Sequence, residues 1–183
     1  MSEEDRKRWD AKYQTGSTHR ELAPDPFVVR ALEHFESVDG LRALDFASGV
    51  GRNALELARR GFDCEAWDVS PVGLDVLGEN AERQQLEVRT RVVDADELSV
   101  ESAAFDLVCV VNFLHRPLLQ RVRELLVPGG HLVFATFTVD RPGDRPSARH
   151  CLERGELTRG FEGFETLLHI EEGGRAGILA RRI

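Results

Sequence analysis

The sequence has no long hydrophobic run. No window of its 183 residues approaches the roughly 18 consecutive apolar residues that a membrane-spanning helix needs. The first ten residues, MSEEDRKRWD, mix both charges and lead into no apolar stretch, so they do not resemble a secretory signal. We therefore expect a cytoplasmic protein without a membrane partner.

Cysteine is also scarce, and the three cysteines are widely spaced with no CxxC motif. Cys64 and Cys109 lie in apolar runs of strand length, where a buried thiol acts as a small hydrophobic side chain. Cys151 follows His150, but an isolated pair of this kind is weak evidence for a metal or a reactive thiol. No other His or Cys cluster has metal-ligand spacing, so we expect no metal site.

Basic residues are in the minority, with 24 Lys and Arg against 32 Asp and Glu and a formal net charge of −8. Nucleic-acid-binding surfaces are usually basic patches or stripes, so this balance argues against a nucleic-acid partner. Internal repeats and low-complexity segments are absent as well. The length predicts a single domain over 1–183, which buries about 70% of the surface of the unfolded chain.

The chain begins with a polar stretch and then changes character. Residues 1–25 predict an N-terminal arm, short helix or lid, in front of a core over 26–183. A helix is expected to start at Asp25-Pro26, because Asp suits the N-cap and Pro the first helical position.

Strand-like runs then alternate with helical patterns. The predicted strands are 41–46, 62–69, 88–93, 105–111 and 131–137, and the predicted helices are 52–60, 71–84, a short one near 96–101, and 117–126. This alternation indicates βαβ units and a mostly parallel sheet with helices on both faces. Two further runs, 164–171 and 175–183, are separated only by a turn at Gly173-Gly174, so they must pair antiparallel. The predicted fold class is therefore α/β: a Rossmann-like, mostly parallel seven-stranded sheet that ends in an antiparallel hairpin.

The segment 42–69 predicts a cofactor site. It reads as a strand ending in Asp45, a glycine turn with Gly49 and Gly51, a helix, and a second strand ending in Asp68. The turn matches the dinucleotide pattern GxGxxA, which would place a pyrophosphate at the helix N-terminus. Asp45 would bring like charge near that anion, whereas it would attract the ammonium of S-adenosylmethionine.

Several motifs in order make the chain resemble the class I S-adenosylmethionine-dependent methyltransferases over about 25–183. They are DFASGVG at 45–51, AWDVS at 66–70, VVDAD at 92–96 and LLVPGGHLVF at 125–134, and the terminal hairpin also matches. GRNALELARRG, NFLHRPL and RELLVPGG look like the small-molecule branch that includes tellurite-resistance methyltransferases. The resemblance implies S-adenosylmethionine as cofactor.

The resemblance also implies residue roles. Asp45 and the backbone of 49–51 would hold the methionine part, Asp68 the ribose, Val69 the adenine face, and Asp94 with Ala95 the adenine edge. The full predicted cofactor site is Asp45, Gly49, Gly51, Arg52, Asn53, Asp68, Val69, Asp94, Ala95, Asn112 and Phe113. Three of these residues have a purely structural alternative, since Asp68 could favour a helix N-terminus, Asp94 could hold a turn, and Asn112 could do the same at a strand end.

The sequence departs from the family pattern in places. Ala47 and Ser48 stand where the family usually has Gly and often Cys, and the side chain of Ala47 could narrow the pocket. Gly73 and Gly78 lie inside a predicted helix, where each costs about 1 kcal/mol relative to Ala; they permit close packing or simply weaken the helix.

The acceptor side is less defined. Asn112 and Phe113 are expected near the reacting methyl, and His115 is the candidate general base, unless it only shapes the start of the next helix. Trp9 and Tyr13 in the arm, and Arg145 and Arg149 in the Pro- and Arg-rich loop 139–157, are candidate acceptor-binding residues; for this loop a lid and a solvated surface are both open.

The segment at 112–115 reads NFLH, not the NPPY typical of many nucleic-acid amino-methyltransferases. Together with the acidic charge, this favours a small-molecule acceptor. We therefore predict a small-molecule methyltransferase. The alternatives are a non-catalytic binding or regulatory protein on the same fold, since fold does not determine function, and a nicotinamide-dependent oxidoreductase.

Overall fold

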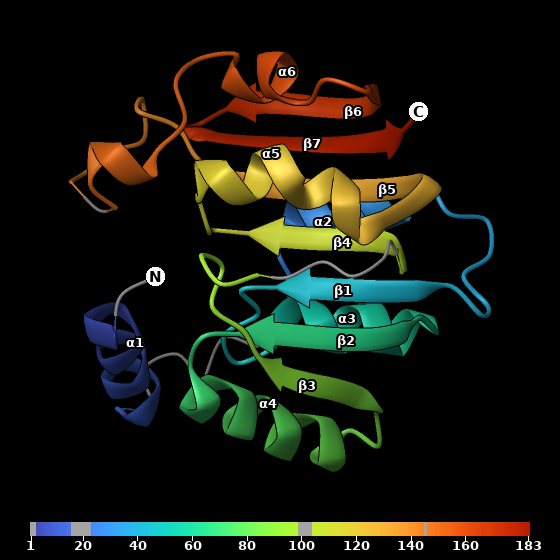
Figure 1. Cartoon of the computed structure of the whole chain (residues 1–183), viewed down its shortest axis with the longest axis vertical. Coiled ribbons are helices and arrows are strands. Elements are labelled where there is room, and N and C mark those ends of the chain that lie inside the picture. Colours follow the sequence, from blue (N-terminus) through green and yellow to red (C-terminus); the bar gives the residue numbers. More distant parts are fainter. Residues whose placement is uncertain (1–2, 16–22, 99–103, 145) are drawn as a thin grey trace.

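A computed structural model of the chain describes residues 3–15, 23–98, 104–144 and 146–183. Helices and strands alternate along most of the chain (Figure 1). In order they are α1 (Glu3–Gln14), α2 (Pro26–Leu32), β1 (Arg42–Phe46), α3 (Arg52–Arg60), β2 (Asp63–Asp68), α4 (Pro71–Arg83), β3 (Val88–Val92), β4 (Phe105–Val111), α5 (Arg116–Leu125), β5 (Leu126–Phe137), a 3-10 turn (Ala148–His150), α6 (Glu156–Gly160), β6 (Phe164–Glu172) and β7 (Arg175–Arg182).

The seven strands form one sheet in the order β3-β2-β1-β4-β5-β7-β6. Strands β1 to β5 are parallel, and β7 runs antiparallel to both β5 and β6. The turn between β6 and β7 is made by Gly173 and Gly174, which both have positive φ. The predicted fold class is confirmed, including the closing hairpin.

The core lies on both faces of this sheet. Figure 1 shows α5 in front of the sheet and α2 and α3 behind it. Strand β4 is covered on both sides: Leu107 and Cys109 join the cluster that includes residues of α2, α3 and α4, while Val108 and Val110 join the cluster under α5. A continuous apolar run is what a parallel strand buried on both faces requires.

The helix starts follow the expected capping chemistry. Asp25 caps α2, with its side chain accepting the N–H of Phe27 at 3.0 Å and Pro26 in the first turn. Ser70 caps α4 in the same way through Gly73. Such caps satisfy backbone donors that the helix itself leaves open.

The expected short helix near 96–101 is not seen in the described part of that segment. Residues 94–98 form a turn, and 99–103 lie outside the described residues. In the described chain, the α5 side of β1 to β3 therefore carries no helix (Figure 1).

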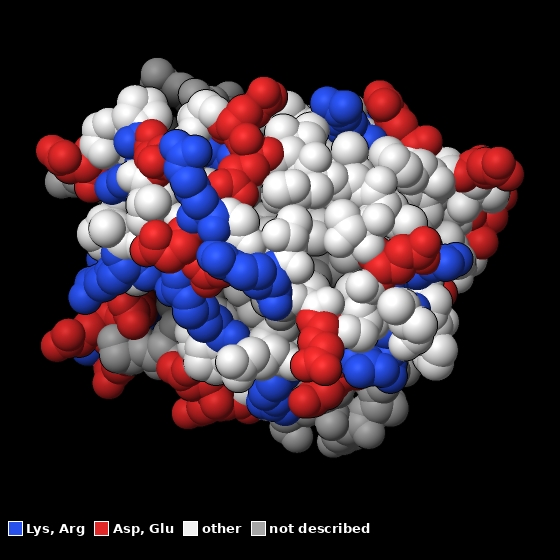
Figure 2. All heavy atoms as spheres, turned by 90° about the horizontal axis from the view of Figure 1, so that it is seen from above, with Lys and Arg blue, Asp and Glu red and all other residues white. Residues whose placement is uncertain are grey.

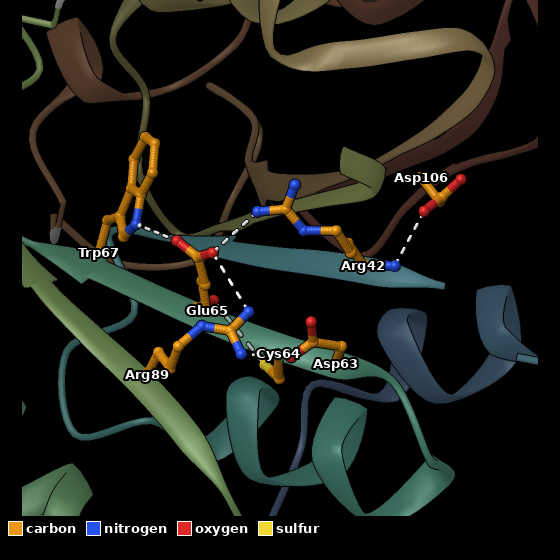
Figure 3. Close-up of polar contacts among 7 residues, drawn as sticks. All are labelled: Arg42, Asp63, Cys64, Glu65, Trp67, Arg89 and Asp106. Carbon is orange, nitrogen blue, oxygen red and sulfur yellow. Dashed lines mark hydrogen bonds and ion pairs between the residues drawn. The ribbon is translucent and has the colours of Figure 1, made fainter. Parts of the chain in front are cut away.

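Charged side chains cover this open part of the sheet instead. Figure 3 shows Glu65 between two guanidinium groups, accepting hydrogen bonds from Arg42 at 3.1 Å and Arg89 at 3.3 Å. The indole of Trp67 donates to the other oxygen of the same carboxylate at 3.2 Å. Because the guanidinium of Arg42 also lies 5.2 Å from the ring of Phe105, the network shields aromatic surface from water.

Candidate functional site

A cavity of about 390 Å³ opens at the carboxyl ends of the parallel strands. It lies where β1 and β4 stand side by side and the chain order of the strands reverses. Open α/β sheets bind ligands at this position. The cavity is lined by Trp9, Lys12, Tyr13, Phe46, Ala47, Ser48, Gly49, Val50, Arg52, Asn53, Asp68, Val69, Val93, Ala95, Val111, Asn112 and Phe113.

Both central strands end in strained backbone at this cavity. Ala47 follows β1 with φ +57°, and Asn112 follows β4 with φ +57°. A residue with a side chain adopts this left-handed conformation at a cost of roughly 1–2 kcal/mol. Gly49 and Gly51 in the same turn also have positive φ, which glycine tolerates. The chain therefore turns sharply away from the sheet at both strand ends and leaves the crevice open.

Asp68 ties the glycine turn to the end of β2. One carboxylate oxygen accepts the N–H of Gly49 and the other accepts the N–H of Ser70, each at 2.8 Å. The carboxylate is nearly buried and lines the cavity. Burial raises its pKa, while the backbone donors oppose this effect. Asp68 therefore holds the backbone at the start of α4, which was its structural alternative, and also lines the cavity.

Asp45, predicted to contact the cofactor, lies beneath the cavity lining. It is outside the cavity lining, fully buried, and accepts the N–H of Ala54 at 2.9 Å, in the first turn of α3. Burial raises its pKa to about 7, although the Ala54 hydrogen bond and the charge of Arg52 act in the opposite direction. Gly51 is also outside the lining. A β-carbon there would lie 2.3 Å from the side chain of Leu77, so this glycine allows α3 and α4 to pack closely.

The N-terminal arm forms one wall of the cavity. Tyr13 of α1 is buried, and a β-carbon added to Gly49 would lie 2.7 Å from its hydroxyl. Asp10 and the hydroxyl of Ser70 form a second contact between α1 and the core. Burial, followed by the nearby charge of Asp68, raises the pKa of Tyr13. The arm is therefore docked onto the site through a short polar and aromatic contact.

Trp9 and Lys12 extend this wall. Trp9 stacks on Tyr13 with ring centroids 5.7 Å apart, and the ammonium of Lys12 lies 4.3 Å from the Trp9 ring. Partial burial, with a smaller contribution from Arg8, lowers the pKa of Lys12. The sequence pattern indicated Trp9 and Tyr13 but not Lys12; its spacing three residues after Trp9 on one helix was the available signal.

Of the three residues predicted to contact adenine, two line the cavity and one does not. Val69 and Ala95 line the cavity, together with Val93. Asp94 does not line it, and its carboxylate accepts the N–H of Asp96 at 2.9 Å. This is the turn-holding arrangement that the sequence left open as an alternative for Asp94.

His115 takes a structural position. Its Nδ1 accepts the N–H of Leu118 at 3.2 Å, which makes it the N-cap of α5, and its Nε2 lies 2.8 Å from a carboxylate oxygen of Asp96. With Nδ1 accepting, the proton resides on Nε2 and points at Asp96. His115 is outside the cavity lining and has no lone pair left for an acceptor's proton, so the predicted base role is not supported by this geometry.

The sequence analysis missed a hydrogen-bond network that includes the side chain of Asn112. Arg175 at the start of β7 donates to the side-chain oxygen of Asn112 at 3.0 Å and to Asp25 at 2.7 Å. Asp25 also accepts from Arg52 at 3.2 Å, and its own N–H donates to Asn53 at 2.9 Å. No sequence signal joins these residues, because the pairing of Arg175 with Asp25 spans 150 positions.

Of the two arginines predicted in the loop 139–157, the structure describes only one. Arg149 is exposed, contacts His150 at 3.0 Å and does not line the cavity, while Arg145 lies outside the described residues. Cys151 is buried in the same loop.

Seen from the β6 and α6 side, the basic side chains on the surface have acidic side chains beside them (Figure 2). Over the described residues, no group of three or more His, Cys, Asp or Glu is arranged to hold a metal, and no helix is long and apolar enough to cross a membrane.

Comparison with known proteins shows similarity to methyltransferases. The methyltransferase domain family model matches residues 43–130. The ubiquinone biosynthesis O-methyltransferase of Coxiella burnetii is 30% identical over 118 residues, which are 62% of this chain and 50% of that protein. The probable S-adenosyl-L-methionine-dependent methyltransferase TehB of Haemophilus influenzae is 25% identical over 171 residues, 89% of this chain and 56% of its own. The chain spans about half the length of the curated relatives it matches.

The solved structures agree at the level of the fold. The crystal structure of TehB from Haemophilus influenzae superimposes with a TM-score of 0.76 at 21% identity, covering 92% of this chain and 65% of that one. A methyltransferase structure from Aquifex aeolicus gives 0.74 at 17% identity, covering 95% and 98%. Over residues 43–130 the chain therefore matches the methyltransferase domain model, and its motifs and strand order resemble those of class I S-adenosylmethionine-dependent methyltransferases such as TehB.

Proposed function

We propose that this chain is an S-adenosylmethionine-dependent methyltransferase that acts on a small-molecule acceptor. The observation that carries the proposal is Asp68, a nearly buried carboxylate that faces the cavity while holding the glycine turn at Gly49. A buried carboxylate with free lone pairs at this turn can accept the hydroxyl groups of a ribose, as a nucleoside-type ligand requires. The name of the Coxiella burnetii relative refers to ubiquinone biosynthesis, which supports a small-molecule acceptor.

The cavity residues fit the cofactor. The hydroxyl of Ser48 is buried in the cavity lining and has no hydrogen-bond partner in the described structure. A buried polar atom of this kind is costly unless a ligand or water completes it. Ser48 therefore offers a hydrogen bond to the methionine end, and Asp68 keeps oxygen lone pairs for the ribose hydroxyls beyond its two backbone bonds.

When bound, S-adenosylmethionine supplies a methyl group on a positively charged sulfur that is a good leaving group. The protein then has mainly to position the acceptor and exclude water. In this proposal Trp9 and Tyr13 close one side of the cavity, and Asn112 and Phe113 form the wall at the reacting end. Arg52, held by Asp25 at 3.2 Å, faces the cavity beside them.

The direct test is calorimetric titration of the purified chain with S-adenosylmethionine, S-adenosylhomocysteine and NADH. We expect both adenosyl ligands to bind and NADH not to bind. Binding of NADH in preference to both adenosyl ligands would refute the proposal. Transfer of a labelled methyl group to members of a small-molecule panel, with bulk RNA and DNA as comparison substrates, then separates an enzyme from a binding protein.

The variant Asp68→Ala tests the site assignment. It should lower affinity for S-adenosylhomocysteine at least ten-fold and also lower stability, since Gly49 and Ser70 lose their acceptor. Asp75→Ala is the matched control, because Asp75 is an exposed acid of α4 outside the cavity lining. Equal affinities for the two variants would remove Asp68 from the site.

A further inference from the structure

The orientation of the Asn112 side chain is set by its neighbour. The guanidinium of Arg175 lies 3.0 Å from the side-chain oxygen of Asn112. A guanidinium has only donors, so the amide oxygen must face it and the amide nitrogen must face away. Asn112 is exposed and lines the cavity, and within the described residues no partner takes its NH₂ group. The strand end therefore presents hydrogen-bond donors, not an acceptor, to the cavity.

This orientation is held from several sides. A second nitrogen of Arg175 donates to Asp25 at 2.7 Å, and the side chain of Asp25 is only 4% exposed. The guanidinium also lies over the ring of Phe137, 4.8 Å from its centroid. The backbone N–H of Asn112 donates to Ala135 at 2.8 Å, which anchors the strained residue to β5. Rotation of the amide would break the Arg175 contact and place two donors against each other.

Two consequences follow for a methyl acceptor beside Asn112. An amine brings N–H donors of its own, which the NH₂ group of Asn112 cannot accept, because the amide oxygen faces Arg175. Methylation of a neutral amine also moves the positive charge from the sulfur onto the acceptor nitrogen, closer to the guanidinium of Arg175. An oxygen anion, in contrast, accepts the free N–H of Asn112. It is also attracted by the guanidinium groups of Arg175 and Arg52, because the single carboxylate of Asp25 between them neutralises only one of their two charges.

Resting on the proposed function, we propose that Arg175 is a positioning residue that fixes Asn112 as a hydrogen-bond donor, and that the acceptor atom is an anionic oxygen. The oxygen uses one lone pair to form the bond to the methyl carbon. The bond from that carbon to sulfur breaks, its electron pair returns to sulfur, and both charges disappear. A hydroxyl acceptor gives its proton to solvent before this step, so no base is required. This agrees with the engagement of both ring nitrogens of His115.

The test uses two probes of matched shape, 4-nitrophenol and 4-nitroaniline, on the full chain saturated with S-adenosylhomocysteine. Absorbance reports whether the bound phenol is ionised. We expect the phenolate to bind at least ten-fold more tightly than the aniline, and the pKa of the phenol to fall on binding. Equal or tighter binding of the aniline, an unchanged phenol pKa, or no phenolate binding at millimolar concentration would overturn the inference. Failure of S-adenosylhomocysteine itself to bind would instead count against the proposed function.

Variants separate positioning from general stability. Arg175→Met should remove most of the phenolate preference, Arg175→Lys should restore part of it, and Asn112→Asp should abolish it by facing the probe with a carboxylate. Arg181→Met is the control, since Arg181 lies on the same strand but pairs with Glu165 on β6. A preference that survives in Arg175→Met, or that Arg181→Met loses to the same extent, contradicts a positioning role for Arg175.

Discussion

The ring of Tyr13 packs so closely on Gly73 that a β-carbon at this glycine would lie 2.9 Å from two of the ring carbons. Gly73 is in the first turn of α4, and the carbonyl of Gly49 lies 3.1 Å from the same point. The polar helix α1 therefore docks on the cofactor turn through one aromatic side chain that only glycines accommodate. Of the two glycines in α4, Gly73 serves close packing, whereas Gly78 has open space around it.

This difference predicts that substitution by alanine harms ligand binding at Gly73 and stabilises the protein at Gly78. Gly73→Ala should displace Tyr13 and lower affinity for S-adenosylhomocysteine several-fold, because the wall of the cavity shifts. Gly78→Ala should raise the free energy of unfolding by about 0.5–1 kcal/mol, since it removes backbone entropy from the unfolded chain and meets no neighbour. Urea unfolding and calorimetric titration of both variants measure this. A Gly73→Ala protein with unchanged affinity would contradict the docking of α1 at the site.

Ala47 predicts a stabilising change to glycine. It stands at φ +57°, where a side chain is strained, so Ala47→Gly should raise the free energy of unfolding by about 1 kcal/mol. Ala58→Gly provides the comparison, because Ala58 lies within α3 and the same change there should cost about 1 kcal/mol. Chemical denaturation of the two proteins gives the sign directly. If both variants lose stability, the strain at Ala47 is absent in solution.

Asp45 predicts a stability that depends on pH. Its pKa rises from 3.8 to about 7 on folding, mainly through burial, so between these values the folded state binds more protons than the unfolded state. Its contribution is thus fully present below about pH 4 and is lost as pH rises through about 7. Asp45→Asn removes the charge and should be more stable than the parent at pH 8, by a clearly larger margin than at pH 5, where only part of the parent's loss has occurred.

Urea unfolding at the two pH values tests this. Asp75→Asn is the matched control, since it removes the same charge from an exposed acid of α4. A stability difference between Asp45→Asn and the parent that is the same at pH 5 and pH 8 would mean that Asp45 is not the titrating group.

His115 predicts a loss of stability without a loss of chemistry. His115→Ala removes the N-cap of α5 and should cost about 1 kcal/mol, whereas His115→Asn should recover most of this because Asn caps helices well. Binding of S-adenosylhomocysteine should be unchanged in both, since His115 is outside the cavity lining. Once an acceptor is known, methyl transfer by His115→Asn at near-parent rate is expected; its loss would restore the base hypothesis.

The agreement between sequence and structure is highest for the elements. Strands such as Phe105–Val111 were predictable because burial on both faces requires a continuous apolar run, and the helix starts at Asp25 and Ser70 because capping is a local interaction. The segment 42–69 predicted a cofactor site, whereas the strand order that brings the ends of β1 and β4 together at the cavity is a finding of the structure. The short helix near 96–101 was wrong over its described part, where a turn held by Asp94 replaces it.

Features that depend on nearby residues in the chain could be predicted from the sequence, whereas contacts between distant residues could not. By itself, the sequence determined the alternation of strands and helices, the closing hairpin, the glycine turn and the acids beside it, because these depend on neighbours in the chain. Only the tertiary structure decided that Asp45 lies beneath the cavity, that both nitrogens of His115 are engaged, and that Arg175 reaches Asn112 and Asp25. The physical reason is that hydrogen-bond partners and burial are properties of the packed chain, and residues 25, 112 and 175 meet only after the sheet has formed.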